Sequence, residues 1–170
     1  RISDVGVVLD LMIHDVDIIL SMINSELVSI SAIGRCIRTD HEDIASAQLT
    51  FANGAMAQIL VSRVSEKRIR QMEITEAERY ITVNYETQDI SVQRCVRQSG
   101  GNLVEVMEHP VFPKTEPLKM ELQHFVSCVR EGRQPMVGIK DGKRALEVCV
   151  AVLRQIHEEK NSGGSILSAI

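Results

Sequence analysis

The sequence predicts an α+β fold, in which an open, mainly antiparallel sheet of about six or seven strands carries an N-terminal helix and two C-terminal helices on one face. Three observations support this class. An apolar run with helical spacing opens the chain, period-two alternation with short turns fills its middle, and two further helical patterns close it. The short turns indicate antiparallel neighbours, because a parallel crossover needs about a dozen residues. The chain of 170 residues is expected to form a single domain over residues 1–170.

The first helix is predicted over about residues 6–23, where most side chains are apolar. Four polar residues follow one another there at steps of four, three and four: Asp10, His14, Asp17 and Ser21. At about 3.6 residues per turn these positions share one face of a helix that is otherwise buried. This polar stripe either faces solvent as a plain surface or lines a cleft, and the spacing alone leaves both alternatives open.

The middle of the chain alternates apolar and polar residues, as half-buried strands do. The dipeptide Asn53-Gly54 lies between two such runs and predicts a hairpin turn with positive φ. Gly34 lies where a bulge would interrupt the first strand. The strands are expected at about residues 28–34, 45–51, 55–61, 68–75, 79–85, 89–96 and 102–108.

Two helices are predicted to close the chain after a proline-rich connector at residues 109–117. The first begins around Thr115 to Pro117, with Thr115 as its cap, and ends at Gly132, while the second begins near Asp141. Helical spacing directs these apolar residues inward: Leu118, Leu122, Phe125, Val126 and Val129 in the first helix, and Ala145, Leu146, Cys149, Val152, Leu153 and Ile156 in the second.

The strand at 55–61 is apolar on both faces. Met56 and Leu60 lie on the face opposite to Ile59 and Val61. One face is expected to be covered by the helices, so the other needs a different partner. We therefore expect a homo-oligomer that forms through the sheet face.

Composition excludes several classes of function. A net charge of −4 without a basic run argues against a nucleic-acid partner and against anionic membrane surfaces. The longest apolar stretch is interrupted by charged residues, so no membrane span is expected. The four cysteines are scattered, with neither a C-x-x-C pair nor zinc-ligand spacing, which predicts a reduced, cytoplasmic protein.

His14 is the residue of the stripe with the most chemical potential. Asp10 precedes it by four residues, a spacing that permits a carboxylate–imidazole hydrogen bond and suits a general acid–base residue. The alternatives are a structural histidine in a satisfied core position, or an exposed ion pair of small energetic weight. No metal site is expected, because Asp10, His14 and Asp17 on one helix do not converge easily on one ion.

Two segments of the chain resemble the C-terminal domain of the Gfo/Idh/MocA oxidoreductases, the relatives of glucose-fructose oxidoreductase and inositol dehydrogenase. The first segment is Gly6 to Ile23, with its D-x-x-x-H-x-x-D pattern. The second segment has Glu116-Pro117-Leu118, Glu121-Leu122, Phe125, Glu131-Gly132, Pro135, Asp141-Gly142 and Ala145-Leu146 in the family's order. Within the family, the lead-in and Arg63-Val64-Ser65 are most similar to the UDP-N-acetylglucosamine 3-dehydrogenase-like subgroup.

The resemblance implies the substrate and oligomerisation domain of a longer dehydrogenase, which acts on a hydroxyl of a sugar, inositol or nucleotide sugar. It implies His14 as the acid–base residue and Asp10 as its partner or a substrate contact. Arg63, by contrast, is a candidate substrate contact from the residues themselves, because it clusters after the hairpin with Lys67, Arg68 and Arg70. That cluster either meets an anionic group of the substrate or is a solvated strand end. The resemblance also implies NAD or NADP, bound mainly by an N-terminal Rossmann domain, because the family's glycine-rich loop and Glu-Lys-Pro lysine are absent from these 170 residues. The fragment alone is then expected to be inactive. The alternative is a non-catalytic dimerising or sugar-binding module with the same fold.

Overall fold

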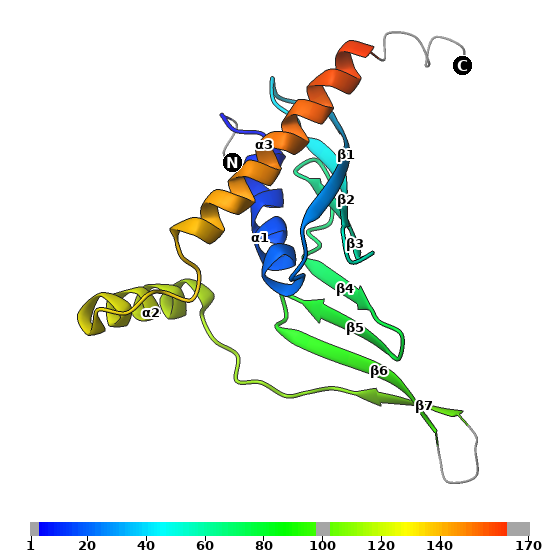
Figure 1. Ribbon diagram of the computed structural model, residues 1–170, viewed down its shortest axis with the longest axis vertical. Helices are drawn as coiled ribbons and strands as arrows, with labels where there is room; N and C mark the ends of the chain where they lie inside the picture. Colours follow the sequence, from blue (N-terminus) through cyan, green and yellow to red (C-terminus); the bar gives the residue numbers. More distant parts are fainter. Residues whose placement is uncertain (1–3, 98–102, 163–170) are drawn as a thin grey trace. The chain divides into compact units, whose positions relative to one another are not determined.

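A computed structural model describes residues 4–97 and 103–162, and of the last two of these only the backbone. The chain divides into two compact units, each described here by itself. The first unit is formed by Arg1–Ser65 and Gln134–Ile170, and the second by Glu66–Arg133. Helices begin and end the described chain, and antiparallel strands lie between them (Figure 1), so the predicted α+β class is confirmed.

The first unit begins with a helix in two parts, a π-helical turn η1 (Val8–Met12) and the α-helix α1 (Ile13–Met22). Together they occupy the predicted first helix. Its apolar sides are buried through Val7, Val8, Met12, Val16, Ile19 and Leu20. The π-helical turn was not predicted, because the apolar pattern was interpreted with a uniform α-helical period.

The first sheet has three antiparallel strands in the order β1 (Leu27–Arg35), β2 (Ile44–Phe51) and β3 (Met56–Ser62). Its buried face carries the predicted alternating residues of β2, namely Ala45, Ala47, Leu49 and Phe51. The hairpin turn is confirmed, with φ of 84° at Gly54, but the positive φ also expected at Asn53 was wrong. The bulge prediction at Gly34 was wrong, since the register shifts between Leu27 and Ser29 instead.

The long helix α3 (Ile139–Ser162) packs against β1 and α1, so these helices cover the same sheet (Figure 1). It buries Ala145, Val148, Cys149, Val152 and Ile156. Gly34 explains the close approach, because a Cβ atom at this position would lie 2.9 Å from Cδ1 of Ile156. The glycine therefore serves helix–sheet packing rather than a bulge.

The second unit holds a separate four-stranded antiparallel sheet in the order β4 (Gln71–Thr75), β5 (Arg79–Asn84), β6 (Asp89–Arg97) and β7 (Leu103–Glu108). The described strands therefore number seven, as expected, but they are divided between two sheets. The division falls at residues 63–70, which follow β3 and lie outside both sheets. Five of these eight residues are charged: Arg63, Glu66, Lys67, Arg68 and Arg70.

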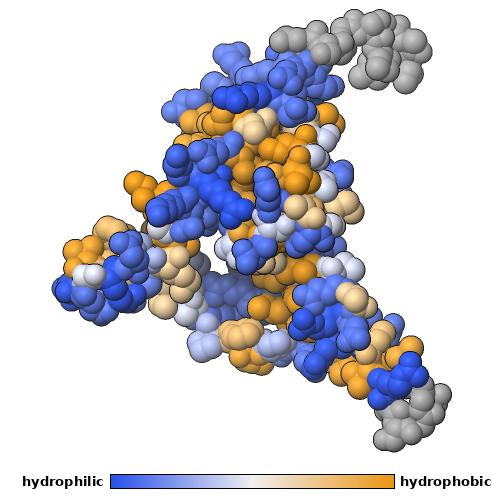
Figure 2. Space-filling model, in the orientation of Figure 1, coloured by the Kyte–Doolittle hydropathy of each residue, from blue (hydrophilic) through white to orange (hydrophobic). Residues whose placement is uncertain are grey.

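The helix α2 (Pro117–Glu131) also belongs to the second unit. It begins with Pro117 in its first turn and ends at Gly132, whose φ is 64°, as predicted, but its cap is Glu116 rather than Thr115. Its apolar face, predicted to be buried, is exposed on the surface (Figure 2). The exposed fractions lie between 45% and 66% for Leu118, Leu122, Phe125, Val126 and Val129. Helical periodicity identified the apolar face correctly but carries no information about what covers it.

Among the described residues, no helix is both long and apolar enough to cross a membrane.

Candidate active site

The polar stripe of the first helix lies on its accessible side. His14 and Ser21 are exposed, and Asp10 and Asp17 are half-buried. The opposite sides carry fully buried residues such as Met12 and Val16. The imidazole of His14 is therefore reachable from solvent, which an acid–base role requires.

The π-helical turn places Asp10 differently from an uninterrupted α-helix. The N–H of Ile13 donates to the carbonyl of Val8, five residues earlier, while the N–H of Asp10 donates to the carbonyl of Gly6 at 3.1 Å. A π turn holds one residue more than an α turn, so the even spacing of the stripe is broken between Asp10 and His14. Such turns occur frequently at functional sites.

Arg63 and Asp10 were predicted as site residues independently, and the fold brings them together. Nη2 of Arg63, directly after β3, lies 3.7 Å from Oδ2 of Asp10. The same nitrogen donates a hydrogen bond of 2.5 Å to the carbonyl of Val5. The carboxylate of Asp10 is thus paired with Arg63, and within the described residues no hydrogen bond joins it to His14. The side chain of Arg63 is only 11% exposed, so most of the guanidinium lies behind the surface.

Asp43, just before β2, is an additional charged residue of this region that the sequence reasoning missed. Its side chain is fully buried, and Oδ1 lies 4.0 Å from Nε of Arg63. The backbone N–H of Arg38, together with those of Ile37 and Thr39 and the Thr39 hydroxyl, holds the pKa of the Asp43 carboxyl far below its usual range. In the sequence Asp43 belongs to the polar run T-D-H-E-D, which has the composition of a solvated loop.

The neighbouring Glu42 caps the start of the first helix. Its carboxylate accepts a hydrogen bond of 3.2 Å from the N–H of Val8, and its backbone carbonyl accepts one of 2.9 Å from Val7. A carboxylate at a helix N-terminus satisfies a free N–H group and is favoured by the helix dipole. Gly6 leaves room for this carboxylate, because a Cβ atom at Gly6 would lie 1.8 Å from Oε1 of Glu42.

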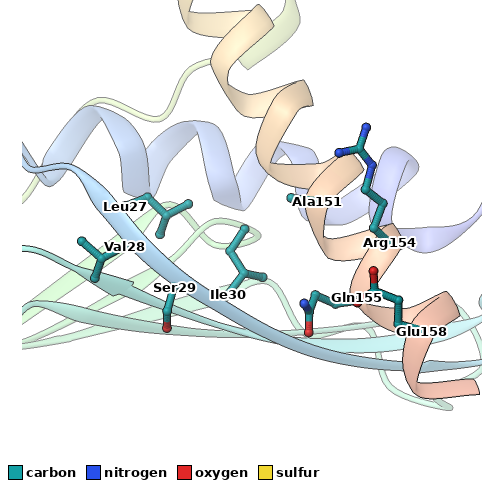
Figure 3. A pocket seen from close by; sticks show the side chains of 8 residues that line it. All are labelled: Leu27, Val28, Ser29, Ile30, Ala151, Arg154, Gln155 and Glu158. Carbon is teal, nitrogen blue, oxygen red and sulfur yellow. The ribbon is translucent and has the colours of Figure 1, made fainter. Parts of the chain in front are cut away.

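A groove of about 340 Å³ lies elsewhere in the first unit, between β1 and α3 (Figure 3). It is lined by Leu27, Val28, Ser29, Ile30, Ala151, Arg154, Gln155 and Glu158. None of these residues belongs to η1 or α1, so the groove is not part of the candidate active site.

Further site residues could come from the cysteines or from a group of metal ligands. The four cysteines are free, and Cys36 and Cys95 are exposed whereas Cys128 and Cys149 are buried. Among the described residues, no group of three or more His, Cys, Asp or Glu side chains could hold a metal ion.

Comparisons with known proteins agree with this fold. Residues 2–81, which include the four residues of the stripe and Arg63, match the family model of the GFO/IDH/MocA C-terminal domain. The chain is 31% identical over 157 residues to UDP-N-acetylglucosamine 3-dehydrogenase of Acidithiobacillus ferrooxidans, covering 89% of this chain and 50% of that protein. It is 30% identical over 156 residues to scyllo-inositol 2-dehydrogenase (NAD(+)) of Bacillus subtilis, covering 86% of this chain and 44% of that protein.

Solved structures show the same similarity. A structure of UDP-N-acetylglucosamine 3-dehydrogenase from Acidithiobacillus ferrooxidans superposes with a TM-score of 0.79 at 28% identity, covering 90% of this chain and 48% of that chain. Levoglucosan dehydrogenase in complex with NADH shares the fold, with a TM-score of 0.72 at 20% identity over 88% of this chain and 48% of that one. The chain spans about half the length of the curated relatives it matches. Residues 2–81 thus match the C-terminal domain of the Gfo/Idh/MocA oxidoreductases, and most of the chain shares its fold with the solved UDP-N-acetylglucosamine 3-dehydrogenase.

Proposed function

We propose that this chain is the substrate and oligomerisation domain of a longer NAD(P)-dependent oxidoreductase, which acts on a hydroxyl of a sugar, inositol or nucleotide sugar. One observation carries the proposal: an accessible His14 follows an Asp10 paired with Arg63, on a helix whose opposite side is buried. Relatives named as sugar-nucleotide and inositol dehydrogenases support the substrate class. A cytoplasmic location remains a prediction from the cysteine pattern.

In this proposal His14 handles the proton of the reacting hydroxyl. A hydroxyl loses its proton when its carbon becomes a carbonyl, and the neutral imidazole accepts that proton; in the reverse direction the imidazolium returns it. Asp10 contacts a substrate hydroxyl or orients the imidazole, and Asp17 is structural. A direct contact between Arg63 and the substrate remains a prediction.

The described residues do not form a dinucleotide site by themselves. Such sites use parallel βαβ units with a glycine-rich turn before a helix, whereas all described strand pairs here are antiparallel. NAD or NADP, which supplies hydride chemistry in dehydrogenases, is therefore proposed to be held mainly by residues outside this chain.

The test uses the intact protein with a panel of sugars, inositols and nucleotide sugars and either nicotinamide cofactor. Replacing His14→Ala should lower kcat by about 10²–10⁴-fold and leave the melting temperature nearly unchanged, because the side chain is exposed. The matched control is His41→Ala, which removes another exposed histidine of the same unit. Equal turnover of His14→Ala and the control would refute the assignment and favour the non-catalytic module.

A homo-oligomer through the first sheet is part of the proposal. The face turned away from α1 and α3 carries Ile33, Met56 and Leu60, which are 54%, 70% and 69% exposed. Its other residues are Ser, Thr, Gln and Ile, apart from Arg35. Large exposed apolar side chains on an almost uncharged face are typical of protein interfaces. Light scattering should show that Leu60→Lys lowers the oligomeric state, whereas a monomeric wild type would contradict this part.

A further inference from the structure

The carboxylate of Asp43 accepts four hydrogen bonds. Oδ2 accepts hydrogen bonds from the backbone N–H groups of Ile37, Arg38 and Thr39 at 2.8, 2.6 and 2.9 Å. Oδ1 accepts one from the Thr39 hydroxyl at 3.0 Å. Its backbone is fixed as well, since its N–H donates to the carbonyl of Arg35 and its carbonyl accepts from the N–H of Arg63, both at 2.9 Å.

Arg63 lies between this fixed carboxylate and Asp10. Its Nε is 4.0 Å from Oδ1 of Asp43, and its Nη2 is 3.7 Å from Oδ2 of Asp10. Both separations are ion-pair distances longer than a hydrogen bond. The guanidinium is planar and presents its donors in a rigid fork, so an orientation favoured at one edge is shared by the other. The bond from Nη2 to the carbonyl of Val5 ties the same group to the residues that lead into η1. Asp43 and Asp10 are thus linked through one guanidinium.

Of the three linked side chains, that of Asp10 is the most exposed. Its side chain is 29% exposed, compared with 11% for Arg63 and none for Asp43. A half-buried carboxylate in a π turn would otherwise sample several rotamers, and a catalytic group held in one geometry loses less entropy in the reaction. A buried ion pair often contributes little to the free energy of unfolding, because desolvating the charges offsets their attraction. Orienting the carboxylate of Asp10 is therefore the role that best fits this arrangement.

We propose that Asp43 and Arg63 are positioning residues, which fix the carboxylate of Asp10 in the active site one turn before His14. This inference rests on the proposed function. It also assigns a role to a buried acid that lies outside the polar stripe and is contributed by the loop before β2.

The kinetic test compares variants of the intact protein with the polyol and cofactor that the wild type turns over. Asp43→Asn should lower kcat by about 10–100-fold while KM stays within about threefold, since orientation is lost but the substrate contacts remain. Arg63→Met should lower kcat by a similar factor. Arg63→Lys should recover part of kcat because it restores the charge without the fork. Asp40→Asn and Arg38→Met are matched controls from the same loop, with exposed side chains, and should leave kcat unchanged.

Folded variants with unchanged kcat would overturn the proposal, as would a loss of activity that follows the folded fraction measured by circular dichroism. A second measurement is independent of turnover. In a double-mutant cycle on urea unfolding, Asp10→Asn and Asp43→Asn should be non-additive by about three- to tenfold in the unfolding equilibrium constant, and Arg63→Met should abolish this coupling. If the wild type oxidises no compound of the panel, the proposed function fails, and additivity in the cycle then overturns the positioning separately.

Discussion

Replacing Gly6→Ala tests how the first helix is anchored. The added Cβ would lie 1.8, 2.1 and 2.3 Å from Oε1, Cδ and Oε2 of Glu42, distances that no real contact allows. The Glu42 side chain is flexible and can turn away, so the steric overlap itself is not what costs stability. The cost comes from the hydrogen bond of 3.2 Å between the Glu42 carboxylate and the N–H of Val8, which that movement breaks.

The magnitude follows from this bond. A hydrogen bond that involves a charged group contributes about 1.5–3 kcal/mol, and both groups lie in a region where Val7 and Val8 are fully buried. Alanine also restricts the unfolded chain, which returns about 0.4–1 kcal/mol. The expected net loss is therefore about 0.5–2.6 kcal/mol in the free energy of unfolding, as the difference of these two ranges.

Urea denaturation of the intact protein measures this loss, and a second background identifies its cause. In a Glu42→Ala protein the carboxylate is already gone, so Gly6→Ala should cost nothing or become slightly stabilising. A penalty of the same size in both backgrounds would show that the carboxylate is not responsible, and a penalty below about 0.5 kcal/mol in the wild-type background would show that the cap contributes little.

Three further predictions follow from packing, burial and charge. Gly34→Ala should destabilise the protein by about 1–3 kcal/mol, because its Cβ would meet Ile156 at 2.9 Å; urea denaturation measures this, and no loss would contradict the helix–sheet packing. Ellman's reagent should modify the exposed Cys36 and Cys95 rapidly and the buried Cys128 and Cys149 only after unfolding. Burial also raises the pKa of the Cys149 thiol to about 11, which lowers its reactivity further. Rapid modification of all four cysteines in the folded protein would contradict this expectation. Because the pKa of Asp43 is lowered in the folded state, its stabilisation is present above the ordinary carboxyl value of about 4 and is lost as pH falls toward the folded value. The wild type should therefore lose more stability than Asp43→Asn as the solution is acidified below about pH 4, and parallel acid titrations would contradict this.

The sequence was sufficient for the elements whose signal is local. The alternation from Ala45 to Phe51 and the Asn53-Gly54 turn specify the β2–β3 hairpin, because side chains on one face of a strand recur every second residue. It was not sufficient for the division into two sheets or for the exposed apolar face of α2. Both depend on which surfaces meet in space, and an apolar stripe such as Leu118, Leu122 and Phe125 has the same spacing whether it is covered or not.

The candidate site was predictable to a similar degree. Asp10 and His14 are recognisable because they interrupt an apolar helix, and both lie on its accessible side. Asp43 was not recognisable, since burial of a carboxylate depends on the donors that the loop of Ile37, Arg38 and Thr39 supplies after folding. Its pairing with Arg63 joins the start of one strand to the end of another, a proximity that only the antiparallel register creates.

The π turn at Val8–Met12 has a consequence for comparing members of the family by alignment. A relative with an ordinary α turn at this place would have one residue fewer before the histidine helix. If this chain and such a relative were aligned without a gap, His14 would match the relative's histidine, but Asp10 would be aligned with a residue that is not its structural equivalent. Equivalent acids in relatives at about 30% identity should accordingly be chosen by superposing the backbone around the turn, and a one-residue gap there should be treated as structural.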